Sequence, residues 1–190
     1  MVALIIVAAA GVVLAIYLVG IYNSLVSVRE RVKQSWANID VLLKQRHDEL
    51  PKLIETCKQY MQFEQETLDK VMRARTAVYA ASSGGSVAAL GTAEQQLRGD
   101  LGRLFAVAEN YPQLKTDESF RQLQQRITGL EESIADRREL YNDEVNINNT
   151  RIDQFPDALI ARRYGFTAKP LLEFAAAEKT DVDVGAMFKR

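Results

Sequence analysis

The chain has 190 residues, which fits one domain of ordinary size with a small appendage. Its 24 Lys and Arg side chains nearly balance 25 Asp and Glu, so the net charge of −1 does not favour a nucleic-acid partner. Hydrophobic residues make up 47% and charged residues 26%, a composition typical of a folded chain. The single cysteine, Cys57, excludes an intrachain disulfide.

The first predicted element is an apolar segment over residues 2–21, which we call the apolar span. No side chain is charged from residue 2 to residue 28. As a helix, the span reaches about 30 Å, the thickness of a hydrocarbon core. Tyr17 and Tyr22 lie where an aromatic ring can sit at the membrane interface. We therefore predict a transmembrane helix over residues 1–22.

Two other interpretations of this segment are weaker. A cleaved signal peptide would have a basic start, a shorter apolar run and a small-x-small cleavage site, and none of these is present. A water-soluble helix would need a polar face, which the span lacks. The basic residues Arg29, Arg31 and Lys33 follow the span, so the positive-inside rule predicts a single-pass protein of the inner membrane with its N-terminus outside and its bundle in the cytoplasm.

A helical bundle is predicted over residues 23–165, because apolar residues recur three and four positions apart. The first stripe comprises Leu25, Val28, Val32, Trp36, Ile39 and Leu42 or Leu43, and it resumes after Pro51 with Leu53, Ile54, Cys57, Tyr60, Met61, Leu68, Val71 and Met72. The stripe crosses Pro51 nearly in phase, which favours a kinked continuous helix with Pro51 as a hinge. The alternative is that Pro51 opens a new helix.

The remaining elements are separated by clear breaks. Residues 82–86, Ser-Ser-Gly-Gly-Ser, predict a reversing loop. Further helices are expected over residues 87–110, from a Thr116 or Asp117 cap to about residue 154, and over residues 157–164 before Gly165. Residues 166–190 show little periodicity and are predicted to form a loosely packed tail.

The predicted fold class is therefore all-α. An N-terminal transmembrane helix continues into an elongated antiparallel bundle of three to four long helices, with coiled-coil-like packing.

Several polar residues fall on the apolar stripes, and we predict that they form a structural polar layer between the helices. They are Arg46, Arg75, Arg137, Tyr141, Asn142 and Asn148. Buried Arg or Asn is costly unless paired, and the candidate partners are Asp40, Glu64, Asp136, Asp143 and Glu144. Two alternatives are that these residues face a partner subunit and that the Asn-rich run 141–150 lines a polar groove.

The residues that common catalytic sites require are missing. The one histidine, His47, is adjacent to Asp48 and Glu49, and adjacent helix residues point in different directions. No second His or Cys gives zinc spacing, and no phosphate loop, dinucleotide fingerprint or nucleophile elbow occurs. We expect no enzyme activity, no cofactor and no metal, and we expect Cys57 to be a buried apolar side chain.

The order of residues along the chain resembles the LemA family. The residues that carry the resemblance are Tyr22 to Val26, Arg29, Val32, Trp36, Ile39 to Val41, Leu43, Arg46, Asp48, Leu50, Pro51, Leu53, Tyr60, Glu64, Ala74, Arg75, Leu101, Leu104, Glu109, Tyr111, Pro112, Arg137, Tyr141, Asn142, Val145, Asn148 or Asn149, Phe155, Pro156, Gly165 and Phe166. The resemblance implies a bacterial, membrane-anchored long-helix bundle without established catalysis, in a group that includes a magnetosome protein. Cys57 departs from the Val expected there, and the Gly/Ser loop is a second departure.

The leading functional hypothesis is a membrane-anchored scaffold or adaptor that assembles with copies of itself. Its expected partners are the lipid bilayer, further copies of the chain and other membrane proteins, with no nucleic acid and no small-molecule substrate. A second hypothesis is a regulator or sensor that passes a membrane signal through the kinked helix. A third, an enzyme using the Arg, Tyr and Asn residues, is the weakest of the three.

Overall fold

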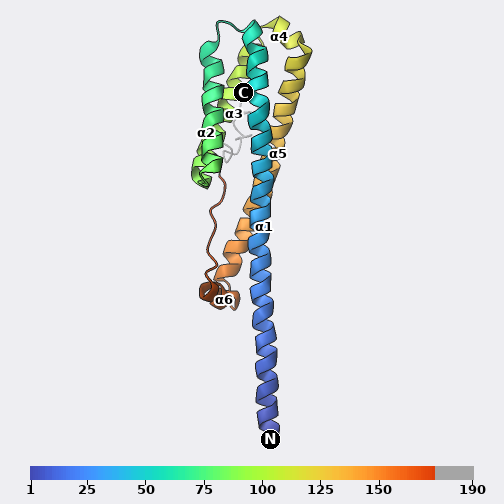
Figure 1. Cartoon of the computed structure of the whole chain (residues 1–190), viewed down its shortest axis with the longest axis vertical. Coiled ribbons are helices and arrows are strands. Elements are labelled where there is room, and N and C mark those ends of the chain that lie inside the picture. Colours follow the sequence, from blue (N-terminus) through green and yellow to red (C-terminus); the bar gives the residue numbers. More distant parts are fainter. Residues whose placement is uncertain (174–190) are drawn as a thin grey trace, which may run out of the picture. The chain divides into compact units, whose positions relative to one another are not determined.

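The computed structural model describes residues 1–173, in which six helices and no strand are present (Figure 1). The helices are α1 (Val2–Tyr60), α2 (Gln65–Ser83), α3 (Val87–Ala108), α4 (Pro112–Thr116), α5 (Glu118–Asp153) and α6 (Asp157–Tyr164). The predicted all-α fold is confirmed, with four long helices and two short ones among the described residues.

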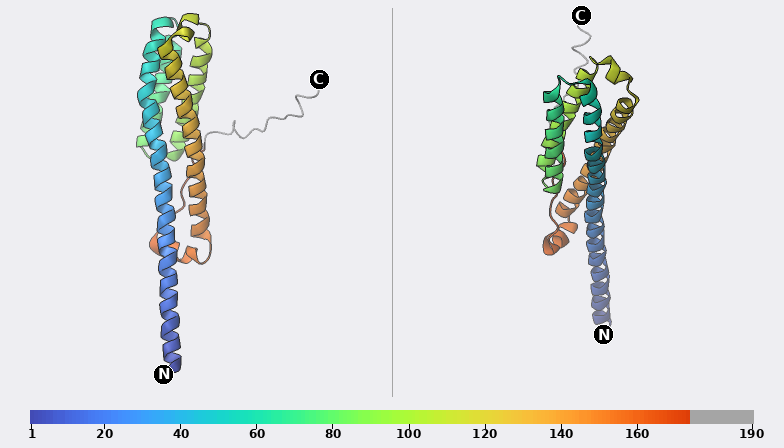
Figure 2. Two further views of the ribbon diagram at one scale, coloured as in Figure 1. Left: turned by 90° about the vertical axis from the view of Figure 1, so that its right-hand side faces the viewer. Right: turned by 45° about the horizontal axis from the view of Figure 1, so that its top comes forward.

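The chain divides into two compact units, to which α1 and α5 both contribute. Unit 1 contains Met1–Val41 and Ser133–Leu171, and unit 2 contains Leu42–Glu132 together with Leu172 and Glu173. In unit 2, α2 and α3 lie side by side (Figures 1 and 2).

The stripe predicted for α1 is buried as expected. Its buried members on α1 are Leu25, Val28, Val32, Ile39, Leu43, Leu53, Ile54 and Cys57, whereas Trp36 and Tyr60 are half-buried. Arg46 and Leu50 are buried as well. α1 continues through Pro51, so the alternative of a new helix at this residue is wrong. Cys57 is fully buried, as expected for a small apolar side chain.

The break between α1 and α2 was not expected from the sequence, which suggested one stripe running to Met72. α1 ends at Tyr60, and the amide of Glu64 donates to the carbonyl of Met61 in a tight turn. No Gly or Pro marks this turn. The turn buries Met61 and leaves Phe63 95% exposed, so tertiary packing, and not local propensity, ends the helix here.

The caps of α3 and α5 follow the usual chemistry of helix N-termini. The Ser86 hydroxyl accepts a hydrogen bond from the Ala89 amide, and the Asp117 carboxylate accepts one from the Phe120 amide at 2.9 Å. Pro112 occupies the first turn of α4, where its missing N–H is harmless. The predicted break at residues 82–86 and the predicted end of the next helix near residue 110 are thus confirmed.

Side-chain contacts within each unit show that α1 and α5 run antiparallel. In unit 1 the contacts are Ser24 with Arg151, Arg31 with Glu144, and Trp36 with Tyr141. In unit 2 they are Arg46 with Glu131, Glu49 with Arg126, and Tyr60 with Asp117. In both units the residue number rises on α1 as it falls on α5, which confirms the predicted antiparallel pairing.

The predicted loose tail is wrong for its first residues. α6 ends at Tyr164, and the left-handed backbone of the capping residue Gly165 (φ 73°) lets the Phe166 amide donate to the Ala161 carbonyl. Residues 167–170 then bond to α5, and Leu172 is buried. A sequence without periodicity can still be held in extended form by side-chain hydrogen bonds. Residues 174–190 of the predicted tail lie outside the described residues.

Candidate functional sites: the apolar span and the polar clusters

The apolar span forms the first third of α1 and is exposed on every side. All residues from Met1 to Gly20 are exposed, and the most apolar 18-residue window has a mean hydropathy of 3.0 with none of it buried. By length and composition, α1 is the one helix of the described residues that could cross a membrane. Exposed apolar residues on all faces are unfavourable in water and favourable in hydrocarbon.

The span meets the rest of unit 1 at α6. Ile21 and Leu25 of α1 form an apolar cluster with Ala161 of α6, and Ile152, Ile160 and Phe166 pack against it. Of the two predicted interface tyrosines, Tyr17 is exposed, while the Tyr22 ring lies 4.9 Å from that of Tyr164.

A buried ionic cluster in unit 2 contains the first residue of the predicted polar layer. Arg46 is 1% exposed, and its guanidinium donates to Glu94 of α3 and, at 2.5 Å, to Glu131 of α5. Neither carboxylate was among the partners considered from the sequence. Because the three residues come from three helices, the cluster connects α1, α3 and α5 at one level of unit 2.

The cluster holds one cation and two carboxylates, so one negative charge is in excess. Burial alone lowers the pKa of Arg46, but the charges of Glu94 and Glu131 more than offset this, and its pKa is raised. Burial raises the pKa of Glu94, Arg46 opposes that rise, and the charge of Glu131 adds to it. Arg46 therefore stays protonated while Glu94 is the group poised to take up a proton.

Arg75 supplies a hydrogen-bond donor to the backbone carbonyl that Pro51 leaves without one. A proline inside a helix has no N–H for the carbonyl four residues earlier, here that of His47. The Arg75 Nε of α2 donates to the His47 carbonyl oxygen at 2.8 Å. Burying that carbonyl without a partner would cost about 1–3 kcal/mol. Arg75, the second residue of the predicted polar layer, thus lies between α2 and α1. Its partner is a backbone carbonyl, whereas a carboxylate was expected.

The His47 ring completes this site. Arg75 also reaches the His47 Nε2 at 2.7 Å, and since a guanidinium only donates, Nε2 must accept and the proton is on Nδ1. Burial lowers the pKa of His47 and the nearby Arg75 charge lowers it further, so a neutral ring is favoured. The ring stacks on Tyr79, with centroids 4.7 Å apart.

The Asn-rich run of α5 holds an extended segment of unit 1. The Asn149 side chain accepts from the Lys169 amide at 2.8 Å and donates to the Lys169 carbonyl at 2.9 Å. Asn148 donates to the Thr167 carbonyl, and the Tyr141 hydroxyl donates to the Pro170 carbonyl at 3.1 Å. We call these contacts the amide clasp. The partners of the Asn-rich run are therefore found in residues 167–170.

Arg137 is the one residue of the predicted polar layer that the structure leaves exposed. It is exposed, whereas the core side chains on either side of it along α5 are Ile134 and Tyr141. Ile134 and Tyr141 are seven residues apart, and the half-buried residues between them are Ala135 and Arg138. The extrapolated stripe was therefore wrong by one position here. Asn142 is half-buried on the same helix.

Sequence reasoning missed Glu94 and Asp100, which are both buried on α3. The signal for Glu94 was present, because the stripe Leu90, Leu97, Leu101 has a seven-residue gap that Glu94 divides into four and three. An acidic residue at such a position needs a cation on a neighbouring stripe. Arg46 is that cation.

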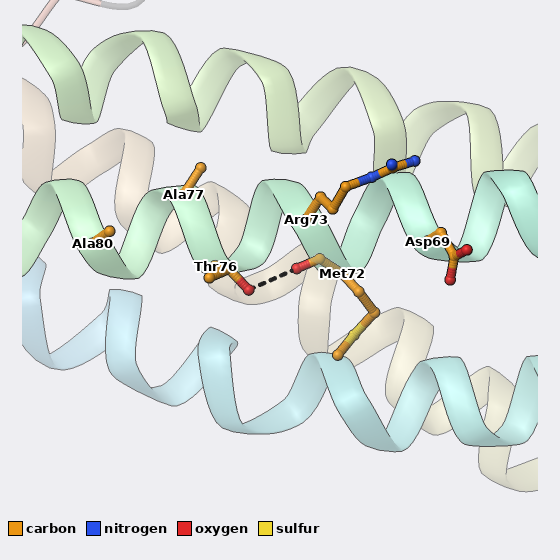
Figure 3. Close-up of a pocket in the computed structure, with 6 residues that line it drawn as sticks. All are labelled: Asp69, Met72, Arg73, Thr76, Ala77 and Ala80. Atoms are coloured by element: carbon orange, nitrogen blue, oxygen red, sulfur yellow. Dashed lines mark hydrogen bonds between the residues drawn. The ribbon is translucent and has the colours of Figure 1, made fainter.

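A shallow hollow of about 680 Å³ lies on α2 and is lined by Asp69, Met72, Arg73, Thr76, Ala77 and Ala80 (Figure 3). All six residues come from one helix, and the Thr76 hydroxyl donates to the Met72 carbonyl of that same helix. No group of three or more His, Cys, Asp or Glu within residues 1–173 is arranged to hold a metal ion.

These features define a class of helical protein in which one long helix carries an apolar span and the rest is a bundle joined by polar clusters. The family model described as LemA family matches residues 35–185. The chain therefore belongs to the LemA family, as the sequence resemblance predicted. The matched range begins after Tyr22 to Val32, so those residues lie outside it.

Relatives of known name are distant. Two proteins of Paramagnetospirillum magneticum, magnetosome protein MamQ 1 and magnetosome protein MamQ 2, are each 24% identical to this chain over 88% of its length and 70% of theirs. Magnetosome protein MamQ of Magnetospirillum gryphiswaldense is 23% identical over 76% of this chain and 62% of its own.

Proposed function

We propose that this LemA-family chain is a membrane-anchored helical scaffold that assembles with copies of itself and has no catalytic activity. The observation that carries the proposal is the apolar span, whose residues from Val2 to Gly20 are all exposed and whose length matches the thickness of a bilayer. The names of the three MamQ relatives refer to a cellular structure, the magnetosome, and to no reaction, which agrees with a scaffold.

An exposed face of α5 in unit 1 supports self-association. Leu140 and Ile147 are both more than 40% exposed and are seven residues apart, the spacing of a coiled-coil contact. Arg137, which is exposed three residues before Leu140, extends this face. The two apolar side chains suit contact with a second copy better than contact with water.

The test is the mass of the full chain in lipid nanodiscs, measured by mass photometry. We expect a defined oligomer, and we expect the double variant Leu140→Gln/Ile147→Gln to be monomeric. The exposed pair Gln95→Asn/Gln125→Asn serves as a control that should assemble normally. A strictly monomeric parent chain with no co-purifying protein would contradict the scaffold proposal.

The proposed orientation places the N-terminus outside and the bundle in the cytoplasm of a cell with an inner membrane. It is supported by Arg29, Arg31 and Lys33, and by Arg162 and Arg163 of α6, which the fold brings to the same end of the span. In inverted membrane vesicles, an added protease should digest the bundle. Protection of the bundle in these vesicles would reverse the assignment.

A second candidate function, a membrane sensor with Pro51 as its hinge, is favoured by one observation. Pro51 lies inside the uninterrupted α1, and the carbonyl it leaves free is held by a side chain of another helix. Such a contact can be made or broken as the helix bends. Pro51→Ala should then change the cellular output while leaving the amount of protein in the membrane unchanged.

A further inference from the structure

The short helix α6 places a second apolar and basic surface at the end of the apolar span. Ala161 of α6 packs on Ile21 and Leu25 of α1. Ile21 is the last residue of the span, and Leu25 is about 6 Å farther along the helix. Figure 1 and the left view of Figure 2 show α6 beside α1 where α1 begins to extend alone.

The exposed surface of α6 combines large apolar side chains with basic ones, whereas a helix end that faces water is usually polar. Leu159 of α6 is 60% exposed, and Phe155, in the turn just before the helix, is 84% exposed. Arg162 and Arg163 follow Leu159, one turn further along the helix. Tyr164, also exposed, packs at a tilt against the half-exposed ring of Tyr22.

The charges around α6 leave its two arginines available to an anion. The acidic residue of the first turn, Asp157, is bonded to Arg151, which also donates to the Ser24 hydroxyl at 2.5 Å. Arg29 lies over the Phe166 ring at 5.3 Å. Arg162 and Arg163 are exposed and form no ion pair within residues 1–173.

We infer that α6 and its flanking aromatic residues are an interfacial membrane-binding element for anionic phospholipids, with Phe155 and Leu159 inserted between the acyl chains and Arg162 and Arg163 bound to the phosphates. The inference rests on the proposed anchoring by residues 2–21. The headgroup layer is about 5–8 Å thick on each side of the hydrocarbon core. This thickness matches the level of the contacts that Ile21 and Leu25 make with α6. Aromatic and basic side chains are the residues preferred at that depth.

Binding of α6 to the interface would restrict the motion of the transmembrane helix. A lone transmembrane helix is free to tilt and to rotate about its axis. A second contact beside the span fixes both, and it makes the orientation of unit 1 depend on the charge of the leaflet.

The test uses the full chain in vesicles, with an environment-sensitive NBD fluorophore on one added cysteine. The added cysteines are Val12→Cys in the span, Leu159→Cys on α6 and Phe63→Cys in the exposed turn of unit 2 as the aqueous control. Cys57 is buried, and the parent chain shows its background labelling. The vesicles are phosphatidylcholine alone or with 30% phosphatidylglycerol, and the quenchers are spin-labelled lipids of shallow and deep position.

If α6 binds the interface, the shallow quencher acts on position 159 more strongly in the anionic vesicles, the deep quencher acts on position 12, and neither acts on position 63. In the variant Arg162→Gln/Arg163→Gln, the ratio of membrane-bound to unbound α6 should fall about 30-fold in anionic vesicles. The control Arg103→Gln/Arg121→Gln removes the same charge from exposed positions of unit 2 and should leave the ratio unchanged.

The two proposals fail in different ways. Quenching at position 12 with none at position 159 overturns the α6 element and keeps the anchor. Quenching at position 159 with none at position 12 supports the element and overturns the anchor. No quenching at either position overturns both, and quenching at position 159 that is equal in the two vesicles overturns the role of the arginines.

Discussion

The two units of this protein use different chemistry to connect their segments. In unit 2, the buried Arg46 is matched by two carboxylates from two other helices. In unit 1, the uncharged Asn149 holds the backbone of Lys169 at the surface. A buried ion pair adds little net stability when complete but is costly to break, because the remaining charge is left without a partner. An exposed amide contact is inexpensive to lose, because water replaces it.

The largest effect is expected for Arg46→Met, which leaves Glu94 and Glu131 facing an apolar side chain. We expect a loss of about 3–5 kcal/mol in the free energy of unfolding, measured by urea titration in detergent with circular dichroism. The triple variant Arg46→Met/Glu94→Leu/Glu131→Leu should recover most of that loss. No recovery would mean that the charges stabilise the fold beyond their mutual pairing.

Cys57 gives a local readout of the same change. Burial raises the pKa of its thiol to about 12, so thiol reagents should label it only when unit 2 opens. In Arg46→Met the labelling rate should rise by at least about a hundredfold. In a variant of the amide clasp, which belongs to unit 1, the rate should stay at the parent value. An equal increase of the Cys57 labelling rate in both variants would show that the two units do not open independently.

The next effect concerns Pro51 and Arg75, and it is best measured as a double-mutant cycle. Arg75→Met should cost about 1–3 kcal/mol of unfolding free energy, because the His47 carbonyl loses its donor. In a Pro51→Ala background, the Ala amide supplies that donor and the same change should cost about 1 kcal/mol less. Additivity within about 0.3 kcal/mol would show that Arg75 does not compensate for Pro51.

A smaller effect is expected at the amide clasp. Asn149→Ala removes two hydrogen bonds to Lys169, and we expect a local loss of about 1 kcal/mol, seen as roughly fivefold faster hydrogen exchange of the Lys169 amide. Asn146→Ala, on the same helix and exposed, is the matched control because it changes helix propensity equally. Faster exchange in both variants would attribute the effect to the helix and not to the clasp.

The last effect is a pH dependence carried by Glu94. Its pKa is raised in the folded protein, so the folded state binds more protons than the unfolded state between pH 4.5 and the folded pKa. Stability relative to Glu94→Gln is therefore full at low pH and falls as pH rises through that window, by no more than about 1.4 kcal/mol per pH unit. Urea titrations of both proteins at pH 4 to 8 measure it. A parent chain that gains stability relative to Glu94→Gln as pH rises would show that Arg46 outweighs burial.

The success of sequence reasoning follows from how local each signal is. The stripe of α1, the cap at Asp117 and the stop at Gly165 depend on residues a few positions apart, and all three are as expected. The turn after Tyr60 depends on how Met61 packs, and no Gly or Pro nearby predicts it. The prediction for Arg137 fails for a related reason, because a stripe extended from Ile134 to Tyr141 without a buried residue between them can shift by one position.

The sequence by itself determined that this protein is helical, that its first helix carries a span apolar on all sides, and that it resembles the LemA family. These properties follow from hydropathy and from the 3-4 spacing of apolar residues, which are local features of the sequence. Only the tertiary structure decided which carboxylates meet Arg46, why Arg75 lies beside His47, and where α6 sits relative to the span. Each of these pairs residues at least 28 positions apart, and such pairs are chosen by the way the helices pack, which no local pattern encodes.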